Sequence, residues 1–352
     1  MLFRSFLRLG TRTLVDAREL ERLVLVVGDK PVPVVVNDGR ERECVFLSPD
    51  VHYVQYMKFE LDKIRNDLSA RALTVAVDAL GRIARPLGFN RCVSVNNWLF
   101  TTNPSLTLSA PELGELTEAL VRRFPAYALV LRNVDAREES ARHLYRDAGW
   151  KLVINRPVHE WSHAGLNRSS RLHVRADAKL LADPRFTVDS RASLAPGDEH
   201  RIAELYRVLY LEKHSRYNPR FTSRFFRAVH DAGMWRFTTV ALDGRIVAFC
   251  TTFDDGPRIV TALVGYDTKL DGHAYPLYRM VVAEAMRHAQ ERGRLLFLST
   301  GSAKFKHYRG SREWIEHEAV YDAHLPPLGR VPWTLFRTAL DLGVKGLDTG
   351  QI

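Results

Sequence analysis

The sequence predicts a mixed α+β fold made of two related halves, each with a mostly antiparallel sheet flanked by helices. The main observation is the order of elements in residues 258–325, which reads as strand, long helix, strand, short basic helix and strand. A weaker version of that order occurs earlier, in residues 111–161. Asp243 and Gly244 also stand between alternating apolar residues, which is a strong hairpin signal. A supersecondary unit that occurs twice indicates two related domains.

The length and composition agree with two domains. The chain has 352 residues, enough for two separate cores, and its 46% hydrophobic and 26% charged residues are ordinary for a globular protein. We expect a first domain at residues 1–185, a second at 186–330 and a tail helix at 331–352. The polar segment 164–198 is where we place the connection between the domains.

The first half is expected to alternate strands and helices. Pro31 and Pro33 predict an edge strand or an irregular strand, because proline has no N–H for a neighbouring strand. Ser109 is the expected N-cap of a helix that has Pro111 at its first position. The expected strands are 20–28, 30–38, 91–95, 127–134 and 151–161, and the expected helices are 51–67, 69–85, 111–123 and 140–149.

The second half is expected to begin with two helices, at 197–212 and 223–230. The first of these has an apolar face at helical spacing. Three strands joined by tight turns follow in residues 234–267, and then the helix, strand, helix and strand described above. The apolar face consists of Ile202, Leu205, Tyr206 and Leu209.

The net charge is +10 and the sequence pI is about 9.6. Such a charge favours acidic partners: a phosphate-bearing cofactor, RNA, an acidic carrier protein or an anionic membrane surface. The alternative is an arginine excess that reflects genome composition. Residues 1–20 lack the apolar core and the cleavage site of a signal peptide, so we do not expect them to be one, and no apolar run reaches membrane-spanning length. We therefore expect a cytoplasmic protein that does not bind DNA and has no stable membrane insertion, with a loose attachment through residues 1–9 as the alternative.

The cysteines argue against a disulfide framework or a zinc site. Cys44, Cys92 and Cys250 lie far apart, in apolar surroundings and without metal-ligand spacing. They are expected to be reduced, buried thiols. We expect no metal site.

Several short strings then resemble the Gcn5-related N-acetyltransferase (GNAT) fold. They are RYNPRFT at 216–222, DGRIVAF at 243–249, GYD at 265–267, FKHYRG at 305–310 and, in the first half, ARHLYRDAGW at 141–150. Two such halves in tandem resemble the FemABX-type transferases and the BioF2-like acyltransferase domains. The resemblance implies an N-acyltransferase, with a degenerate first half and a catalytic second half.

One departure from that family leaves the acyl donor open. Simple members of the GNAT superfamily place a glycine-rich loop before the long helix, where backbone N–H groups hold the coenzyme A pyrophosphate. Residues 267–276 and 103–113 do not match that loop, although Gly272 and Lys269 could form a partial cradle. The expected donor is therefore acyl-CoA, an acyl carrier protein or an aminoacyl-tRNA, with no tightly bound cofactor. The expected acceptor is an amine of a small molecule.

The resemblance also implies a catalytic tyrosine on the short helix, which would protonate the leaving group. Tyr308 is the candidate, and Tyr145 is its counterpart in the first half. The alternative for each is an aromatic residue that packs in the structure. Lys306 and Arg309, three residues apart, would share a helix face and form a phosphate or carboxylate clamp, or else a solvated basic surface.

Other polar residues near the expected strand and helix ends complete the candidate site. Glu212 or His214 would be a general base, since histidine has a suitable pKa, and a surface-turn role is the alternative for each. Asp267 is a further candidate catalytic carboxylate, with a helix-capping or turn role as its alternative. Ser299 would be a positioning donor or would simply end its strand. The remaining candidates for substrate binding are Tyr217, Asn218 and Tyr275.

The loop formed by Asn96, Asn97 and Trp98 would either line a groove or form a turn anchored by a buried tryptophan. The rival to an enzyme is a non-catalytic binding module whose basic groove holds RNA or an acidic carrier protein, since fold alone does not imply activity. A Tyr308 that faces the same cleft as a carboxylate or a histidine favours the enzyme, and a Tyr308 that lies only on the surface favours the binding module.

Overall fold

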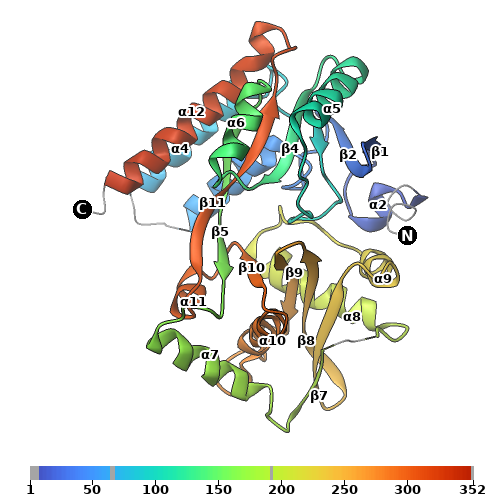
Figure 1. The fold of residues 1–352 in the computed structure, drawn as a ribbon, viewed down its shortest axis with the longest axis vertical. Helices are drawn as coiled ribbons and strands as arrows, with labels where there is room; N and C mark the ends of the chain where they lie inside the picture. The colour runs from blue at the N-terminus through green and yellow to red at the C-terminus, as the bar shows by residue number, and fades with distance from the viewer. Residues whose placement is uncertain (1–7, 64–67, 191–192, 350–352) are drawn as a thin grey trace. The chain divides into compact units, whose positions relative to one another are not determined.

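The computed structural model describes residues 8–63, 68–190 and 193–349 (Figure 1). The chain divides into two compact units, and each unit combines separate segments of the sequence. Unit 1 consists of Met1–Asp16, Pro157–Arg216 and Arg220–Ile315, and unit 2 of Ala17–Arg156, Tyr217–Pro219 and Glu316–Ile352. The strands β5 (Lys151–Trp161) and β11 (Arg312–Tyr321) give residues to both units. The predicted boundaries at 185 and 330 stay a prediction.

Unit 2 holds a sheet in the order β1-β2-β3-β4-β11. Its strands β3 and β4 are parallel, and the other neighbours are antiparallel. Two apolar clusters form its core, one around Leu113 and Leu116 and one around Tyr53 and Trp333. The bounds of the other strands of unit 2 are β1 Glu21–Val27, β2 Lys30–Asp38, β3 Arg91–Val95 and β4 Ala128–Val134.

The helices of unit 2 follow the predicted order. The π-helix η1 runs straight into α3, and the predicted tail helix corresponds to α12, which begins before residue 331. The bounds are η1 Val51–Tyr56, α3 Met57–Asp62, α4 Leu68–Ala84, α5 Ala110–Arg123, α6 Glu139–Asp147 and α12 Pro327–Thr349.

Strand β2 corrects the expectation of an edge strand. It pairs with β1 on one side and with β3 on the other. Pro31 and Pro33 nevertheless lie in the half of β2 that pairs only with β1, since the pairs with β3 begin at Val34. The missing N–H groups therefore fall where the β3 side makes no ladder bond.

The start of α5 confirms the predicted cap. The Ser109 side chain accepts a hydrogen bond from the Glu112 backbone N–H, and the Glu112 carboxylate accepts one from the Ser109 N–H at 2.7 Å. Lys30 adds an ion pair to Glu112 at 2.6 Å. This reciprocal capping satisfies N–H groups that the helix itself leaves without acceptors.

Unit 1 holds a sheet in the order β5-β10-β9-β8-β7-β6. The strands β9 and β10 are parallel, and the other neighbours are antiparallel. Asp243 and Gly244 have φ values of 49° and 76°, so the predicted hairpin turn is confirmed. The remaining bounds are β6 Phe186–Asp189, β7 Arg236–Leu242, β8 Arg245–Asp255, β9 Arg258–Tyr266 and β10 Leu295–Ser299.

The helices of unit 1 pack on that sheet, with α10 against β7, β8, β9 and β10 and α8 against β8 and β9 (Figure 1). The predicted apolar face of the first helix is buried in full. The polar segment 164–198 forms α7 and β6. The bounds are α2 Thr11–Leu14, α7 Arg168–Leu180, α8 Asp198–Arg207, the π-helix η2 Val208–His214, α9 Ser223–Asp231, α10 Leu277–Glu291 and α11 Ala303–Tyr308.

The helices and the mostly antiparallel sheet confirm the predicted mixed α+β class, although the described strands of both units belong to one 11-stranded sheet. The cysteines Cys44, Cys92 and Cys250 are buried, free thiols, as predicted. Of the helices in the described part of the chain, none is long and apolar enough to cross a membrane. Most of the segment 1–9, the alternative membrane attachment, lies outside the described residues.

Candidate active site

The strands β9 and β10 separate at their carboxyl ends. They pair in parallel over three residues, from Arg258 opposite Leu295 to Val260 opposite Phe297. Beyond that point β9 continues to Tyr266 beside β8, and β10 reaches Ser299, which pairs with His159 of β5. Carboxyl ends of parallel strands are the usual ligand-binding edge of an α/β sheet. We therefore place the candidate site of unit 1 at this opening.

The loop between β9 and α10, residues 267–276, folds back on itself. The N–H groups of Leu270 and Asp271 donate to the Asp267 carbonyl, at 3.1 and 3.0 Å. Those of Gly272 and Leu277 donate to the Tyr275 carbonyl, at 3.1 and 2.8 Å. These amides are engaged within the loop, whereas a pyrophosphate cradle needs amides that point at the ligand.

A carboxylate stands at the start of α10. Asp271 Oδ1 accepts a hydrogen bond from the Tyr278 N–H at 3.2 Å. The N-terminus of a helix favours one anionic group, and here that group is supplied by the protein. A pyrophosphate at the same place would meet a negative charge. The partial cradle expected from Gly272 and Lys269 is thus occupied by contacts within the loop.

Lys306 is buried on α11, with 3% of its surface exposed. Its ammonium group donates to the carbonyls of Leu298, Ser299 and Thr300, at 2.8, 2.9 and 2.8 Å. An ammonium group has three N–H donors, so this lysine is fully used in holding the end of β10. Ser299 has a φ of 56°, and its carbonyl is one of the acceptors.

Arg309 is also buried, and it ties three helices together. Its Nε donates to Asp177 of α7, its Nη1 donates to the Phe305 carbonyl at 2.9 Å, and its guanidinium lies 3.3 Å from the Phe305 ring centre. Asp177 also pairs with Arg279 of α10 at 2.6 Å. Lys306 and Arg309 therefore do not form the exposed clamp or the solvated surface that their spacing suggested.

Tyr308 ends α11 and is 57% exposed. Its ring centre lies 5.7 Å from that of His173 on α7. Tyr145 lies in the apolar core of unit 2, where burial raises the pKa of its phenol to about 12. Tyr145 therefore packs as an aromatic core residue, while the catalytic role of Tyr308 stays a prediction.

The candidates around η2 fall in different units. Glu212 is exposed and forms an ion pair with Arg207, and His214 is exposed with its ring 6.1 Å from that of Tyr210. Both belong to unit 1. Tyr217 and Asn218 belong to unit 2, where the Tyr217 ring lies 6.5 Å from that of Phe59. The structure therefore does not place these four residues in one described site.

Asp267 and Tyr275 lie at the two ends of the loop before α10. Asp267 is half-buried and accepts hydrogen bonds from Arg201 and from the Lys269 N–H, both at 3.2 Å. The Tyr275 ring packs edge-on against Phe186 at 6.1 Å. Asp267 thus makes the turn contacts of its structural alternative, and a binding role for either residue stays a prediction.

Two tyrosines at the opening were not among the predicted site residues. The Tyr278 ring lies 5.8 Å from that of Tyr266 and 4.8 Å from that of Phe305. Lys213 Nζ lies 3.5 Å from the Tyr266 hydroxyl. Burial, and then Asp271, raises the pKa of Tyr266 to about 12, and burial likewise raises the pKa of Tyr278. Both phenols thus keep their protons at neutral pH. The GYD string, used above for the resemblance, was the available signal for Tyr266.

His159 is a second residue that sequence reasoning missed. It is buried, with 4% of its surface exposed. Its Nδ1 lies 3.4 Å from Ser311 Oγ, and its Nε2 lies 3.3 Å from a carboxylate oxygen of Glu313. Burial and then the Lys306 charge lower the pKa of His159, against the attraction of Glu313. A histidine within an ordinary strand sequence gave no signal for this arrangement.

Unit 2 has its own parallel pair, β3 and β4, and side chains fill the corresponding edge. Asn133 Oδ1, at the end of β4, accepts from the N–H and Nδ2 of Asn103, at 3.0 and 2.7 Å. Asn133 Nδ2 donates to Glu316, which also accepts from Arg156 at 2.8 Å. The loop before Asn103 is a turn anchored by buried Asn97, while Trp98 is only half-buried.

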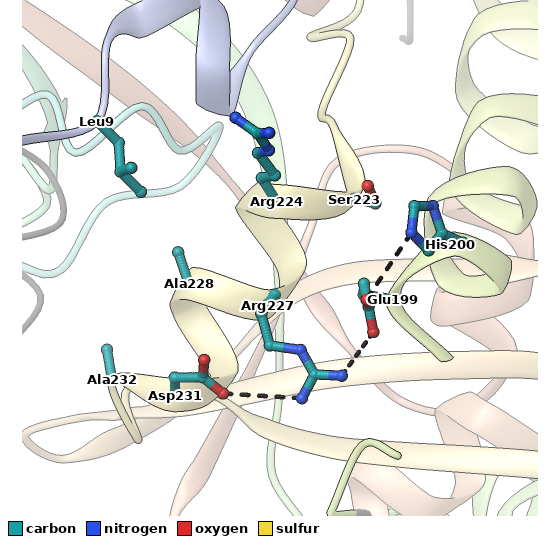
Figure 2. A pocket seen from close by; sticks show the side chains of 9 residues that line it. All are labelled: Leu9, Glu199, His200, Ser223, Arg224, Arg227, Ala228, Asp231 and Ala232. Atoms are coloured by element: carbon teal, nitrogen blue, oxygen red, sulfur yellow. Dashed lines mark hydrogen bonds and ion pairs between the residues drawn. The ribbon is translucent and has the colours of Figure 1, made fainter. Parts of the chain in front are cut away.

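Figure 2 shows a pocket of unit 1 at a different place, between α8, α9 and Leu9. Its volume is about 670 Å³. Arg227 crosses it and pairs with Glu199 at 2.5 Å and with Asp231 at 3.8 Å (Figure 2). None of the predicted site residues lines this pocket. It is lined by Leu9, Glu199, His200, Ser223, Arg224, Arg227, Ala228, Asp231 and Ala232.

A comparison with known protein families finds a match for most of unit 1. Residues 168–307 match the family described as acetyltransferase (GNAT) domain. This segment is similar to GNAT domains. The matched segment begins with α7 and ends within α11, so it contains the β9–β10 opening and Lys306, while His159, Tyr308 and Ser311 lie just outside the match. The predicted GNAT resemblance is confirmed for these residues.

Solved structures resemble this chain at low identity. L-PGS from Bacillus licheniformis is 12% identical, with a TM-score of 0.48, 65% of this chain and 78% of that chain covered. FemX is 11% identical, with a TM-score of 0.48, and the match covers 64% of this chain and 80% of FemX. A GCN5-related N-acetyltransferase from Kribbella flavida is 15% identical, with a TM-score of 0.36, and the match covers 67% of this chain and 83% of that protein. A search of curated proteins finds no match. The BioF2-like part of the resemblance stays a prediction.

Proposed function

We propose that unit 1 transfers an acyl or aminoacyl group to an amine of a small molecule and so forms an amide. The observation that carries the proposal is the GNAT match over residues 168–307, which supports acyl transfer in general. The position of the opening agrees with it, because the facing edges of β9 and β10 stop pairing with each other after Val260 and Phe297. An extended substrate could use those edges.

The residues at the opening and on the neighbouring strand β5 fit the steps of amide formation. The reaction needs an acceptor for the amine proton, stabilisation of the tetrahedral oxyanion and a proton for the leaving group. His159 is neutral at pH 7 because burial lowers its pKa, so it can accept a proton. Tyr266 and Tyr278 keep their protons and can donate. Tyr308 remains the donor that the GNAT resemblance implies.

The acyl donor in this proposal is a thioester on an acyl carrier protein or an aminoacyl-tRNA. Coenzyme A is less well supported, because the amides before α10 are engaged and Asp271 caps Tyr278. Both macromolecular donors are acidic, and the net charge of +10 favours their association. The acceptor remains a small-molecule amine.

A thermal-shift series tests the donor. The ligands are acetyl-CoA, a long-chain acyl-CoA, an acylated carrier protein and bulk aminoacylated tRNA. A ligand at 100 times its Kd stabilises the folded protein by about 2.7 kcal/mol. We expect a saturable rise in Tm with carrier protein or tRNA. A saturable rise with acetyl-CoA would contradict the donor assignment, and no rise with any ligand would contradict the enzyme itself.

One observation favours the rival, a non-catalytic binding module: Tyr308 is 57% exposed and lies beside His173 on the surface. The two functions differ in product. Incubation with charged donor and a mixture of primary amines, followed by mass spectrometry, should detect a new amide for the transferase. A binding module would give the rise in Tm with tRNA or carrier protein and no amide.

A further inference from the structure

A serine, a histidine and a glutamate of unit 1 lie in a row beside the candidate site. Ser311 follows α11, His159 lies in β5, and Glu313 lies in β11. Ser311 Oγ lies 3.4 Å from His159 Nδ1, and His159 Nε2 lies 3.3 Å from Glu313 Oε2. The first contact is a hydrogen bond at the long end of the range, and the second is an ion-pair contact. Catalytic contacts are often loose before a substrate is bound.

The nearby carboxylate favours one of the two ring tautomers. A carboxylate only accepts hydrogen bonds, so the ion-pair contact with Glu313 favours a hydrogen on His159 Nε2. In the neutral ring the lone pair then belongs to Nδ1, which faces the Ser311 hydroxyl. The serine hydroxyl can therefore donate its hydrogen to Nδ1. This is the division of roles in a Ser-His-acid triad, with the two ring nitrogens exchanged.

The surrounding charges keep the ring ready to accept a proton. The charges of Lys306 and His307 on α11 lower the pKa of His159, and the charge of Glu313 on β11 raises it. Burial is the largest cause that lowers the pKa of His159, and the Lys306 charge is the next. At pH 7 the ring is therefore neutral. Ser299 of β10 is opposite His159 in the strand register, so the ring is at the carboxyl end of β10.

The turn that carries Ser311 is held on several sides. Gly310 has a φ of 82°, and a Cβ there would lie 2.6 Å from Leu166 and 3.2 Å from Ser170. The Arg309 carbonyl accepts from Trp161 Nε1 at 2.9 Å, and the Arg309 side chain binds Asp177. A nucleophile needs such support, because an error of about 1 Å in its position is costly.

We propose that Ser311 is an acyl-accepting nucleophile, activated by His159 and Glu313, and that unit 1 transfers acyl groups through an acyl-serine. Ser311 Oγ bonds to the acyl carbon while its proton passes to His159 Nδ1. The bond from that carbon to the leaving group breaks, and the leaving group takes this proton. The acceptor amine then attacks the ester, its proton returns to Ser311 Oγ through His159, and the amide leaves. Only this second step, the transfer from the serine to the amine, rests on the proposed function.

A small electrophile tests the nucleophile directly, since Ser311 keeps only 8% of its surface exposed. Methanesulfonyl fluoride reacts with an activated serine by forming an oxygen–sulfur bond and releasing fluoride. Peptide mass spectrometry of the treated full-length protein should find the sulfonyl group on Ser311. Ser162, in a turn after β5, provides the matched control variant Ser162→Ala, which should label as the wild type does.

Two conservative variants test the activation. His159→Gln should abolish labelling of Ser311, and Glu313→Gln should slow it by at least about tenfold, while circular dichroism shows both to be folded. Wild-type protein without a label on Ser311 overturns the proposal. Equal labelling in wild type and His159→Gln overturns it too. These variants keep the test valid if Ser311→Ala does not fold.

The second step of the proposed reaction, amide formation from the acyl-serine, has a separate readout. Amide formation that is unchanged in folded Ser311→Ala overturns the acyl-serine route and leaves the proposed amide synthesis intact. Conversely, a burst of p-nitrophenol from p-nitrophenyl acetate, lost in Ser311→Ala and without amide product from any donor, supports the nucleophile and counts against the proposed transferase. The two failures are thus distinguishable.

Discussion

At the scale of single residues, Lys306 differs most from the role that its sequence context predicted. The string FKHYRG is basic and suggested an exposed clamp. The structure buries Lys306 beneath the end of β10, where one ammonium group serves three carbonyls. A buried ammonium group is stable only with such partners. The residue is therefore part of the frame that shapes the β9–β10 opening.

Lys306→Met tests that role. The substitution removes the donor from three carbonyls near the end of β10, and the free energy of unfolding should fall by about 2–4 kcal/mol. Urea denaturation monitored by circular dichroism measures it. The control is Lys304→Met, because Lys304 is exposed on the same helix and should change stability by less than about 0.5 kcal/mol. Equal effects of the two variants would contradict the structural role.

Tyr308→Phe tests the tyrosine that the GNAT resemblance nominates. Tyr308 is exposed, so removal of its hydroxyl should leave stability within about 0.5 kcal/mol. If its phenol protonates the leaving group, kcat should fall by about 10²–10⁴ while donor binding is retained. Single-turnover amide formation and the thermal shift measure the two quantities. Unchanged turnover would remove Tyr308 from the mechanism, and Tyr278→Phe is then the next variant.

At the scale of elements, the turn between α11 and β11 positions the proposed nucleophile. Gly310 allows α7 to approach this turn closely, and its φ of 82° is one that residues with a side chain rarely adopt. The preceding Arg309 fixes α11 to α7 through Asp177. This short segment, which the sequence shows only as HYRGSREW, thus sets the direction in which Ser311 points.

Gly310→Ala should destabilise the protein and disturb that direction. Its Cβ would lie 2.6 Å from Leu166, so the free energy of unfolding should fall by about 1–3 kcal/mol. Labelling of Ser311 by methanesulfonyl fluoride should fall at the same time. Gly272→Ala is the matched control, since it has open space around it and should be close to neutral. Full stability and labelling of Gly310→Ala would contradict the close approach.

At the scale of the whole molecule, several buried or half-buried histidines make stability depend on pH. Burial is the largest cause that lowers the pKa of His52, His159, His288 and His324. In the unfolded chain each has a pKa of about 6.5. Below pH 6.5 these histidines bind more protons in the unfolded state than in the folded state, so the free energy of unfolding falls as the pH decreases. Above about pH 7.5 both states are neutral and this contribution is constant.

Urea denaturation at pH 7.5, 6.5 and 5.5 checks this dependence. We expect stability to fall as the pH decreases across that range, with a slope of at most about 1.4 kcal/mol per pH unit for each histidine. His159→Gln should lower the slope, and a variant of an exposed histidine, His200→Gln, should not. Constant stability between pH 5.5 and 7.5 would contradict the prediction.

Much of the fold could be predicted because its signals are local. The hairpin at Asp243–Gly244, the cap at Ser109 and the apolar face of α8 each depend on residues within a few positions of one another. The edge character of β2 was predicted less well, since strand neighbours are set by segments far away in the chain. The split of β5 and β11 between two compact units likewise has no local signal.

The order of elements in residues 168–307, the GNAT resemblance and the mismatch to a pyrophosphate loop before α10 all follow from the amino-acid order alone. Which polar groups face one another depends on the folded structure. His159 and Ser311 are 152 residues apart in the chain, and the strand that carries His159 meets the turn that carries Ser311 only after the sheet has formed. Local patterns specify elements, but a site depends on pairings between distant segments, and these are fixed by the packing of the whole unit.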